Sequence, residues 1–170
     1  MWKRVMILRL SAKLSKKLSL FPQASMPLAD NPFLDWSGHL FRANQRHHII
    51  LTNTPTLYSV LFLGLGITNQ GAFEKWVMKE LLSYLRYDDK ETIFTEYIAP
   101  YFQGILYSKA LNRSVVGSVN DLVFNAKYCI EEQDMSLQET ADFINDMPMS
   151  YILEAFPNLA FRKQALKLHI

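Results

Sequence analysis

The sequence holds little that would tie the chain to an oxidising compartment or a membrane. Only one of its 170 residues, Cys129, is a cysteine, so no disulfide can form within the chain and we expect a reducing compartment, the cytoplasm. The longest apolar stretch after the N-terminus, residues 57–65, includes Tyr58, Ser59 and Gly64. It is far shorter than the roughly 20 residues that span a bilayer. The sequence therefore predicts no membrane partner.

Motifs of known enzymes are missing as well. The sequence contains no phosphate loop, no dinucleotide-binding fingerprint and no zinc-finger spacing. Ser114 lacks the Gly-x-Ser-x-Gly surround of a nucleophilic serine, and Cys129 stands beside Ile130 on the apolar side of a predicted helix. We therefore expect no cofactor, and the sequence leaves open whether the chain is an enzyme at all.

The histidines do not form a metal-binding pattern. His47 and His48 are adjacent, so on a strand they point to opposite faces and cannot bind one ion together. A turn at Asn44 and Gln45 would pair His48 with Phe41, His47 with Arg42 and His39 with Ile50. No cysteine or carboxylate stands at ligand spacing beside them. The sequence thus predicts no metal site.

Core-forming residues, in contrast, are abundant. Hydrophobic residues make up 49% of the sequence and aromatic residues 13%, which is more than a disordered chain carries. A length of 170 residues fits one domain of ordinary size. We therefore expect a single domain over residues 1–170.

Strand-forming segments dominate the first two thirds of the chain. Three runs rich in Ile, Leu, Phe and Tyr are separated by turn-forming residues and predict a three-stranded antiparallel meander. These runs are residues 39–43, 47–53 and 57–63. Further strands are predicted at residues 5–10, 92–99 and 105–111. The expected fold is α+β, with an antiparallel sheet of five or six strands.

Helical spacing of apolar residues predicts the elements that cover this sheet. A central helix is expected over residues 70–86, with Asn69 as its N-cap. Ser118 and Asp121 match a Ser-x-x-acid capping pattern, and a second such pattern begins at Ser136. The C-terminal helices are predicted at residues 119–132, 137–146 and 149–167.

Positive charge is concentrated at the start of the chain. Residues 1–50 carry a net charge of +6, whereas residues 51–170 carry −4. This asymmetry makes the N-terminal third a candidate surface for nucleic acid or another polyanion. The candidate residues are Lys13, Lys16, Lys17, Arg42 and Arg46. The alternative is that these charges simply solvate an exposed helix face.

A polar run at residues 111–121 is the second candidate site. It lies between a predicted strand and a predicted helix, where backbone N–H groups and the positive end of a helix can hold an anion. The candidate ligand-binding residues are Asn112, Arg113, Ser114, Asn120 and Asp121, with Trp36 or Tyr58 beside them. Arg113 near a helix N-terminus implies a bound anion, or a carboxylate partner such as Asp121. The alternative is that the run only caps the helix and turns the chain.

Four segments together resemble a known family. They are residues 36–41 (WSGHLF), 50–60 (ILTNTPTLYSV), 111–121 (LNRSVVGSVND) and 145–150 (NDMPMS). The combination is similar to a family of small bacterial proteins described as a domain of unknown function. The resemblance extends over residues 6–161 and implies that Met6 is the usual start, with residues 1–5 as an extension. It implies no activity and assigns no catalytic residue.

Two classes of function follow from these observations. The favoured one is a non-enzymatic binding or regulatory module that contacts nucleic acid or another polyanion through the basic N-terminal third. The other is an enzyme of unrecognised type acting on an anionic small ligand held by Asn112, Arg113 and Ser114. The first is favoured because the charge asymmetry is visible in the sequence, whereas no base or nucleophile is identifiable for the second.

Overall fold

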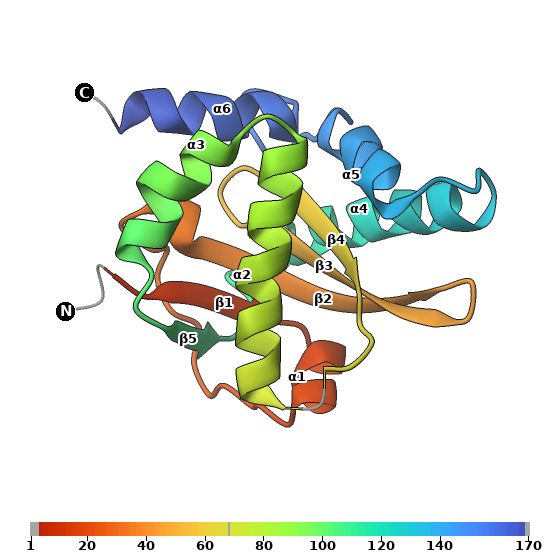
Figure 1. The fold of residues 1–170 in the computed structure, drawn as a ribbon, viewed down its shortest axis with the longest axis horizontal. Coiled ribbons are helices and arrows are strands. Elements are labelled where there is room, and N and C mark those ends of the chain that lie inside the picture. Colours follow the sequence, from red (N-terminus) through yellow and green to blue (C-terminus); the bar gives the residue numbers. More distant parts are fainter. Residues whose placement is uncertain (1–3, 68, 169–170) are drawn as a thin grey trace.

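The fold is an α+β arrangement built around one mixed sheet (Figure 1). The structure is a computed structural model that describes residues 4–67 and 69–168. Five strands within this part of the chain form the sheet in the order β4-β3-β2-β1-β5. They are β1 (Met6–Leu10), β2 (Asp35–Ala43), β3 (Arg46–Asn53), β4 (Ser59–Leu63) and β5 (Ile105–Ser108). Of the extension expected from the resemblance, residues 1–3 lie outside the described part.

The prediction that the whole sheet is antiparallel is wrong for the two pairings of β1. β2, β3 and β4 pair antiparallel, but β1 is parallel to both of its neighbours, β2 and β5. The helix α1 (Ala12–Leu18) and the long connection after it carry the chain back to the start of the sheet before β2. Such a crossover is what parallel neighbours require.

The hairpin between β2 and β3 sets the register of the sheet. Asn44 and Gln45 have φ values of 48° and 63°, the left-handed pair that a two-residue type I′ turn needs. This turn pairs Phe41 with His48 and Arg42 with His47. The position of the turn in the sequence predicts the same pairs, so this part of the prediction is confirmed.

Helices lie on both faces of the sheet. In Figure 1 the long helix α2 crosses the front of the strands, while α4 lies behind them. The Cβ of a residue replacing Gly38 on β2 would lie 2.9 Å from Leu14 of α1, so α1 packs closely on this strand. The helices are α2 (Gln70–Tyr87), α4 (Arg113–Glu131), α5 (Leu137–Asn145) and α6 (Pro157–Lys167). None of the helices in the described ranges is long and apolar enough to cross a membrane.

Two helices begin at residues that differ from the prediction. α4 begins with Asn112 as its cap, not Ser118, because the Asn112 carboxamide accepts the Val115 N–H at 2.9 Å. Ser118 lies inside the helix, where its hydroxyl donates to the Ser114 carbonyl at 2.8 Å. α6 begins at Pro157, a residue favoured in the first turn of a helix.

Residues 92–99, predicted as a strand, are helical. The short helix α3 (Glu91–Ile93) runs into a π-helical turn at Phe94–Ile98 and a 3-10 turn at Ala99–Tyr101. Ile93, Phe94 and Ile98 are all buried, so the β-prone residues serve equally well as the apolar side of a helical turn. Packing overrides local strand propensity here.

The segment at residues 50–60 that carries much of the family resemblance forms a buried polar network. The Asn53 amide donates to the Pro32 carbonyl at 2.8 Å and accepts the Thr56 hydroxyl at 2.6 Å. Further along, the Asn145 carboxamide accepts the Ser59 N–H at 2.7 Å and donates to the Ser59 carbonyl at 2.9 Å. Asn145 thus closes the outer edge of β4. These buried hydrogen bonds stabilise the fold.

Removing the Asn145 amide should be costly. Asn145 is 2% exposed, so an Asn145→Ala variant leaves the Ser59 N–H and C=O groups buried without a partner. We expect the free energy of unfolding to fall by about 2 kcal/mol, within the range for buried polar groups that lose their partner. Urea denaturation followed by circular dichroism measures this loss. Asn158→Ala is the control, because Asn158 donates to Asp146 at the surface, and equal losses in both variants would contradict this role for Asn145.

Candidate anion-binding site

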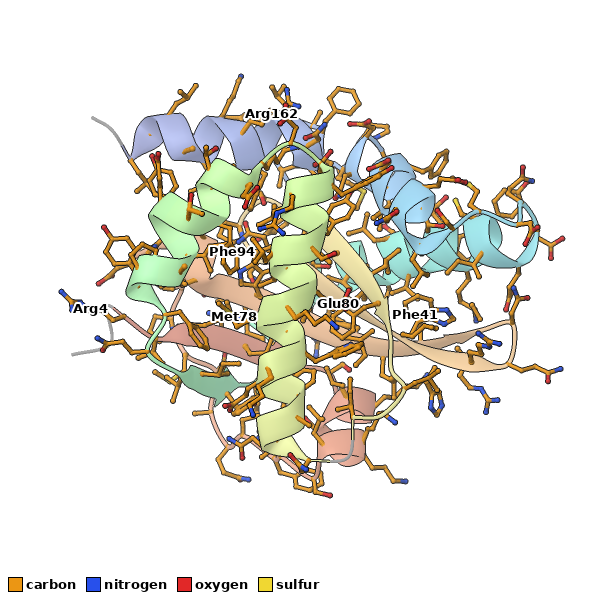
Figure 2. All side chains as sticks on the ribbon, in the orientation of Figure 1. Arg4, Phe41, Met78, Glu80, Phe94 and Arg162 are labelled. Carbon is orange, nitrogen blue, oxygen red and sulfur yellow. The ribbon has the colours of Figure 1, made fainter. Side chains whose placement is uncertain are left out.

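The candidate site lies where β2 extends beyond the end of β1. The last residue of β1, Leu10, pairs with Gly38, while β2 continues to Ala43. Residues 39–43 of β2 are therefore paired with β3 on one side only. Figure 2 shows Phe41 on this free part of the strand, away from β1.

Helices from the two sides of the sheet enclose this free edge. α1 packs over Gly38, on the face of β1 that carries Leu8. Leu8 pairs with Tyr107, whose hydroxyl donates to Glu74 of α2 at 3.0 Å, so α1 and α2 share a face. α4, which follows β5, lies on the other side of the sheet (Figure 1). Crevices beyond the carboxyl ends of parallel strands, where successive helices diverge, are common ligand sites.

A pocket of about 540 Å³ occupies this crevice. It is lined by Lys13 and Lys16 of α1, His39, Leu40, Phe41 and Arg42 of β2, His47 of β3, and Asn120, Val123 and Lys127 of α4. Four of these side chains are cations, and none of the lining residues in the described part of the chain is acidic. The pocket therefore presents a concentrated positive potential.

Local sequence explains why the lysines of α1 point outward. The Ser11 hydroxyl accepts the Leu14 N–H at 3.2 Å and so caps the start of the helix. Leu14 and Leu18 are buried against the sheet, which turns Lys13 and Lys16 to the opposite side. The spacing of apolar residues that packs α1 on the sheet therefore also exposes these two lysines.

His39 contributes shape to the pocket rather than charge. Burial lowers the pKa of His39 to about 4, so its imidazole is neutral at pH 7. His48 stacks on Phe41 with ring centroids 5.3 Å apart, and burial lowers its pKa as well. At neutral pH His39 thus adds no charge to that of the lysines and Arg42.

The structure brings together only part of each predicted set of site residues. Lys13, Lys16 and Arg42 meet in the pocket, and Asn120 of the polar run faces them from α4. Lys17 is half-buried and lines no part of it, while Arg46 is exposed beside the hairpin turn.

The remaining predicted residues need correction. Trp36 and Tyr58 are fully buried: the Trp36 indole donates to the Phe33 carbonyl at 2.8 Å, and Tyr58 stacks on Phe161 with centroids 4.1 Å apart. Both belong to the core: Trp36 lies on β2, and Tyr58 lies just before β4. Asp121 is exposed on α4 and forms no ion pair with Arg113 in the described structure.

Asn112, Arg113 and Ser114 form the exposed first turn of α4, so replacing Arg113 should leave stability almost unchanged. No carboxylate in the described residues pairs with this guanidinium, which also lies near the positive end of the helix dipole. We expect Arg113→Ala to change the free energy of unfolding by less than about 0.5 kcal/mol, as is usual for surface substitutions. Thermal denaturation tests this. A loss of several kcal/mol would reveal a buried partner and contradict the exposed placement.

Lys127 is the cation of the pocket that sequence reasoning missed. It lies seven positions after Asn120 and fourteen after Arg113, so the three share one side of α4. That heptad spacing is visible in the sequence. The sequence does not show what this side of α4 faces, because the position of α4 beside the β2–β3 hairpin depends on the tertiary fold.

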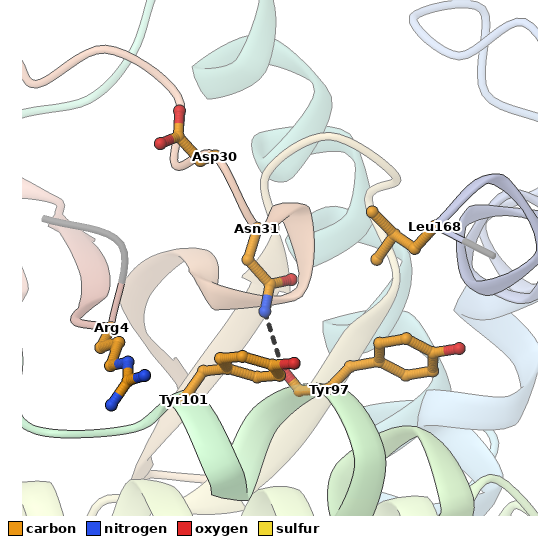
Figure 3. A pocket seen from close by; sticks show the side chains of 6 residues that line it. All are labelled: Arg4, Asp30, Asn31, Tyr97, Tyr101 and Leu168. Atoms are coloured by element: carbon orange, nitrogen blue, oxygen red, sulfur yellow. Dashed lines mark hydrogen bonds between the residues drawn. The ribbon is translucent and has the colours of Figure 1, made fainter. Parts of the chain in front are cut away.

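Two other cavities are less suited to an anion. The larger, about 710 Å³, carries one cation, Arg4, and one carboxylate, Asp30, near Tyr97 and Tyr101 (Figure 3). The Asn31 amide crosses it to donate to the Tyr97 carbonyl at 2.8 Å.

The other cavity is acidic. It is lined by Asp88, Asp89, Asp142 and Asp146, together with Tyr84, Tyr87, Asn145 and Asn158. Asp88 is paired with buried Lys90 and accepts the Tyr58 hydroxyl at 2.5 Å. In the described ranges no three His, Cys, Asp or Glu side chains are grouped so that they could hold a metal ion. This cavity would repel an anion.

Comparison with known proteins defines the class of the chain. Residues 7–159 match a family described as a domain of unknown function, DUF6933, and the chain belongs to this family. The match covers nearly the same residues as the resemblance found from the four segments, which is thereby confirmed. No curated protein and no solved structure matches the chain.

Proposed function

We propose that this chain is a non-enzymatic binding module of the cytoplasm that holds polyanions in the pocket between α1, β2 and α4. The convergence of Lys13, Lys16, Arg42 and Lys127 in a pocket whose described lining contains no acidic residue supports this proposal. Four like charges in one pocket repel one another, so their arrangement costs stability unless an anion neutralises them. Structural roles rarely require such a cluster.

The enzyme alternative gains less support. Asn112, Arg113 and Ser114 are exposed and line none of the three pockets described above. His39, which lines the basic pocket, is neutral at pH 7 because burial lowers its pKa to about 4. No nucleophile stands beside it among the lining residues of the described chain. Binding, without chemistry, is the function that this set of side chains supports.

Charge reversal in the pocket tests the proposal. We expect Lys13→Glu with Lys16→Glu to abolish retention on immobilised heparin and binding of inorganic polyphosphate at moderate salt. Wild-type affinity should fall steeply with salt, because bound polyanions lose condensed counterions. Retention and the salt concentration at elution are the measurements.

The matched control carries the same charge change elsewhere. Arg162 and Lys163 are exposed on α6, at the top of Figure 2, and the Arg162→Glu, Lys163→Glu variant has the same net charge as the pocket variant. We expect this control to retain heparin binding. Equal loss in both variants would show that only bulk charge matters, and absence of wild-type binding would end the proposal.

A further inference from the structure

We infer that the polyanion held by this pocket is single-stranded nucleic acid, whose phosphates meet the four cations and one of whose bases stacks on Phe124. This inference rests on the proposed function and names its ligand class. The observation that carries it is an exposed aromatic side chain beside the basic pocket. Phe124 is 75% exposed, and Tyr128, one turn later, is 52% exposed.

The geometry of α4 places Phe124 next to the pocket. At about 100° per residue, Phe124 lies roughly 40° around the helix from Asn120 and roughly 60° from Lys127. Asn120 and Lys127 line the pocket, so Phe124 projects from the adjoining strip of the same helix. A base on Phe124 and a phosphate beside Lys127 would be separated by less than one helical turn.

Positive charge continues along the same side of α4. Arg113 lies seven residues before Asn120 and is exposed, so Arg113 and Lys127 mark the ends of a strip about 21 Å long. Of the nearby acids, Glu131 forms a hydrogen bond at the hairpin, where its carboxylate accepts the Asn44 N–H at 3.1 Å. Asp121 is exposed about 60° around the helix from Phe124. A flexible strand can follow this strip from the pocket.

The combination of rings and cations distinguishes between polyanions. Heparin and polyphosphate have no aromatic face, so Phe124 would add nothing to their binding. In a duplex the bases are already stacked on each other, and a single exposed ring cannot reach them. Single strands expose both phosphates and base faces, and aromatic stacking contributes about 1–3 kcal/mol per base. Only this class uses all the features of the site.

The test distinguishes the contribution of Phe124 to binding from that of the cations. We expect Phe124→Ala to weaken binding of a fluorescent oligothymidylate by about 5-fold to 150-fold, measured by anisotropy, because each 1.4 kcal/mol of lost stacking is a factor of ten. Heparin retention should stay unchanged. Phe124→Trp should restore oligonucleotide binding, since tryptophan also stacks on bases.

The control and the contrary results are specific. Phe143 is 48% exposed on α5 and lines no part of the pocket, so Phe143→Ala should bind like wild type. If Phe124→Ala binds the oligonucleotide normally while Lys13→Glu with Lys16→Glu does not, this inference fails and the proposed polyanion function stands. Equal affinity of the wild type for duplex and single strand would also overturn it. If the lysine variant binds every probe normally, both proposals fail.

Discussion

Replacing Asp35 with alanine is expected to lower the free energy of unfolding by about 3–5 kcal/mol, the usual effect of leaving one partner of a buried ion pair alone. Arg9 and Asp35 form a bidentate pair, with both N···O distances at 2.8 Å and both side chains fully buried. The remaining guanidinium N–H groups donate to Met26, Pro27 and Ser108. An Asp35→Ala variant would leave this cation in the core without a counter-charge.

The ion pair also holds the connection between α1 and β2. Arg9 binds the carbonyls of Met26 and Pro27, and Asp35 accepts the Ala29 N–H at 2.9 Å. We therefore expect Asp35→Ala to accelerate chymotrypsin cleavage after the exposed residue Leu28. Urea denaturation gives the global loss and timed proteolysis gives the local one.

A double variant separates lost charge from lost packing. Replacing Arg9 with methionine and Asp35 with leucine removes both charges, so no unpaired ion remains buried. We expect this variant to be more stable than Asp35→Ala alone, because apolar replacements of buried pairs are often tolerated. If Asp35→Ala loses less than about 1 kcal/mol, or the double variant is worse, the pair does not act as described.

Local features of the fold were predictable from the sequence because their causes are local. Asn69 caps α2 through a bond from the Ala72 N–H at 2.9 Å, and Ser136 caps α5 through the Glu139 N–H at 3.1 Å. The turn at Asn44 and Gln45 likewise sets the register by its own backbone conformation. Caps, periodicity and turns extend over a few residues, which a sequence pattern captures.

Long-range pairings were not predictable in the same way. The parallel pairing of β1 with β5 joins residues about 100 positions apart, and nothing in either short strand specifies its neighbour. Arg9 contributes to the count of positive charges in residues 1–50, but Asp35, 26 residues away, neutralises it in the core. Ion pairs of this kind depend on topology.

The candidate site likewise has features that the sequence predicts and features that depend on the tertiary fold. The basic excess that identified Lys13, Lys16 and Arg42 is a property of composition, and the structure gathers these residues in one pocket. Asn120 and Lys127 join them only because α4 lies across the free edge of β2. Sequence therefore indicated the charge of the site, whereas its concave shape arises from the crossover between β1 and β2.

Acid should destabilise the protein through His39, and the sign follows from its lowered pKa. The unfolded chain binds a proton at His39 near pH 6.5, but burial holds the pKa in the folded state at about 4. Above about pH 6.5 both states are neutral at this residue, and the full stability is present. As the pH falls toward 4 only the unfolded state takes up the proton, so stability is lost over this interval and not below it.

The expected loss is at most about 3.5 kcal/mol, since each unit of pKa difference corresponds to about 1.4 kcal/mol. Urea denaturation at neutral pH and near pH 4.5 measures it in wild type and in His39→Gln. Carboxylates and His48 contribute their own acid sensitivity to both proteins, so the informative quantity is the difference in slope. His39→Gln should lose less stability than wild type between the two conditions. Parallel pH profiles for the two proteins would show that the His39 imidazole is solvated in the folded state and would contradict its burial.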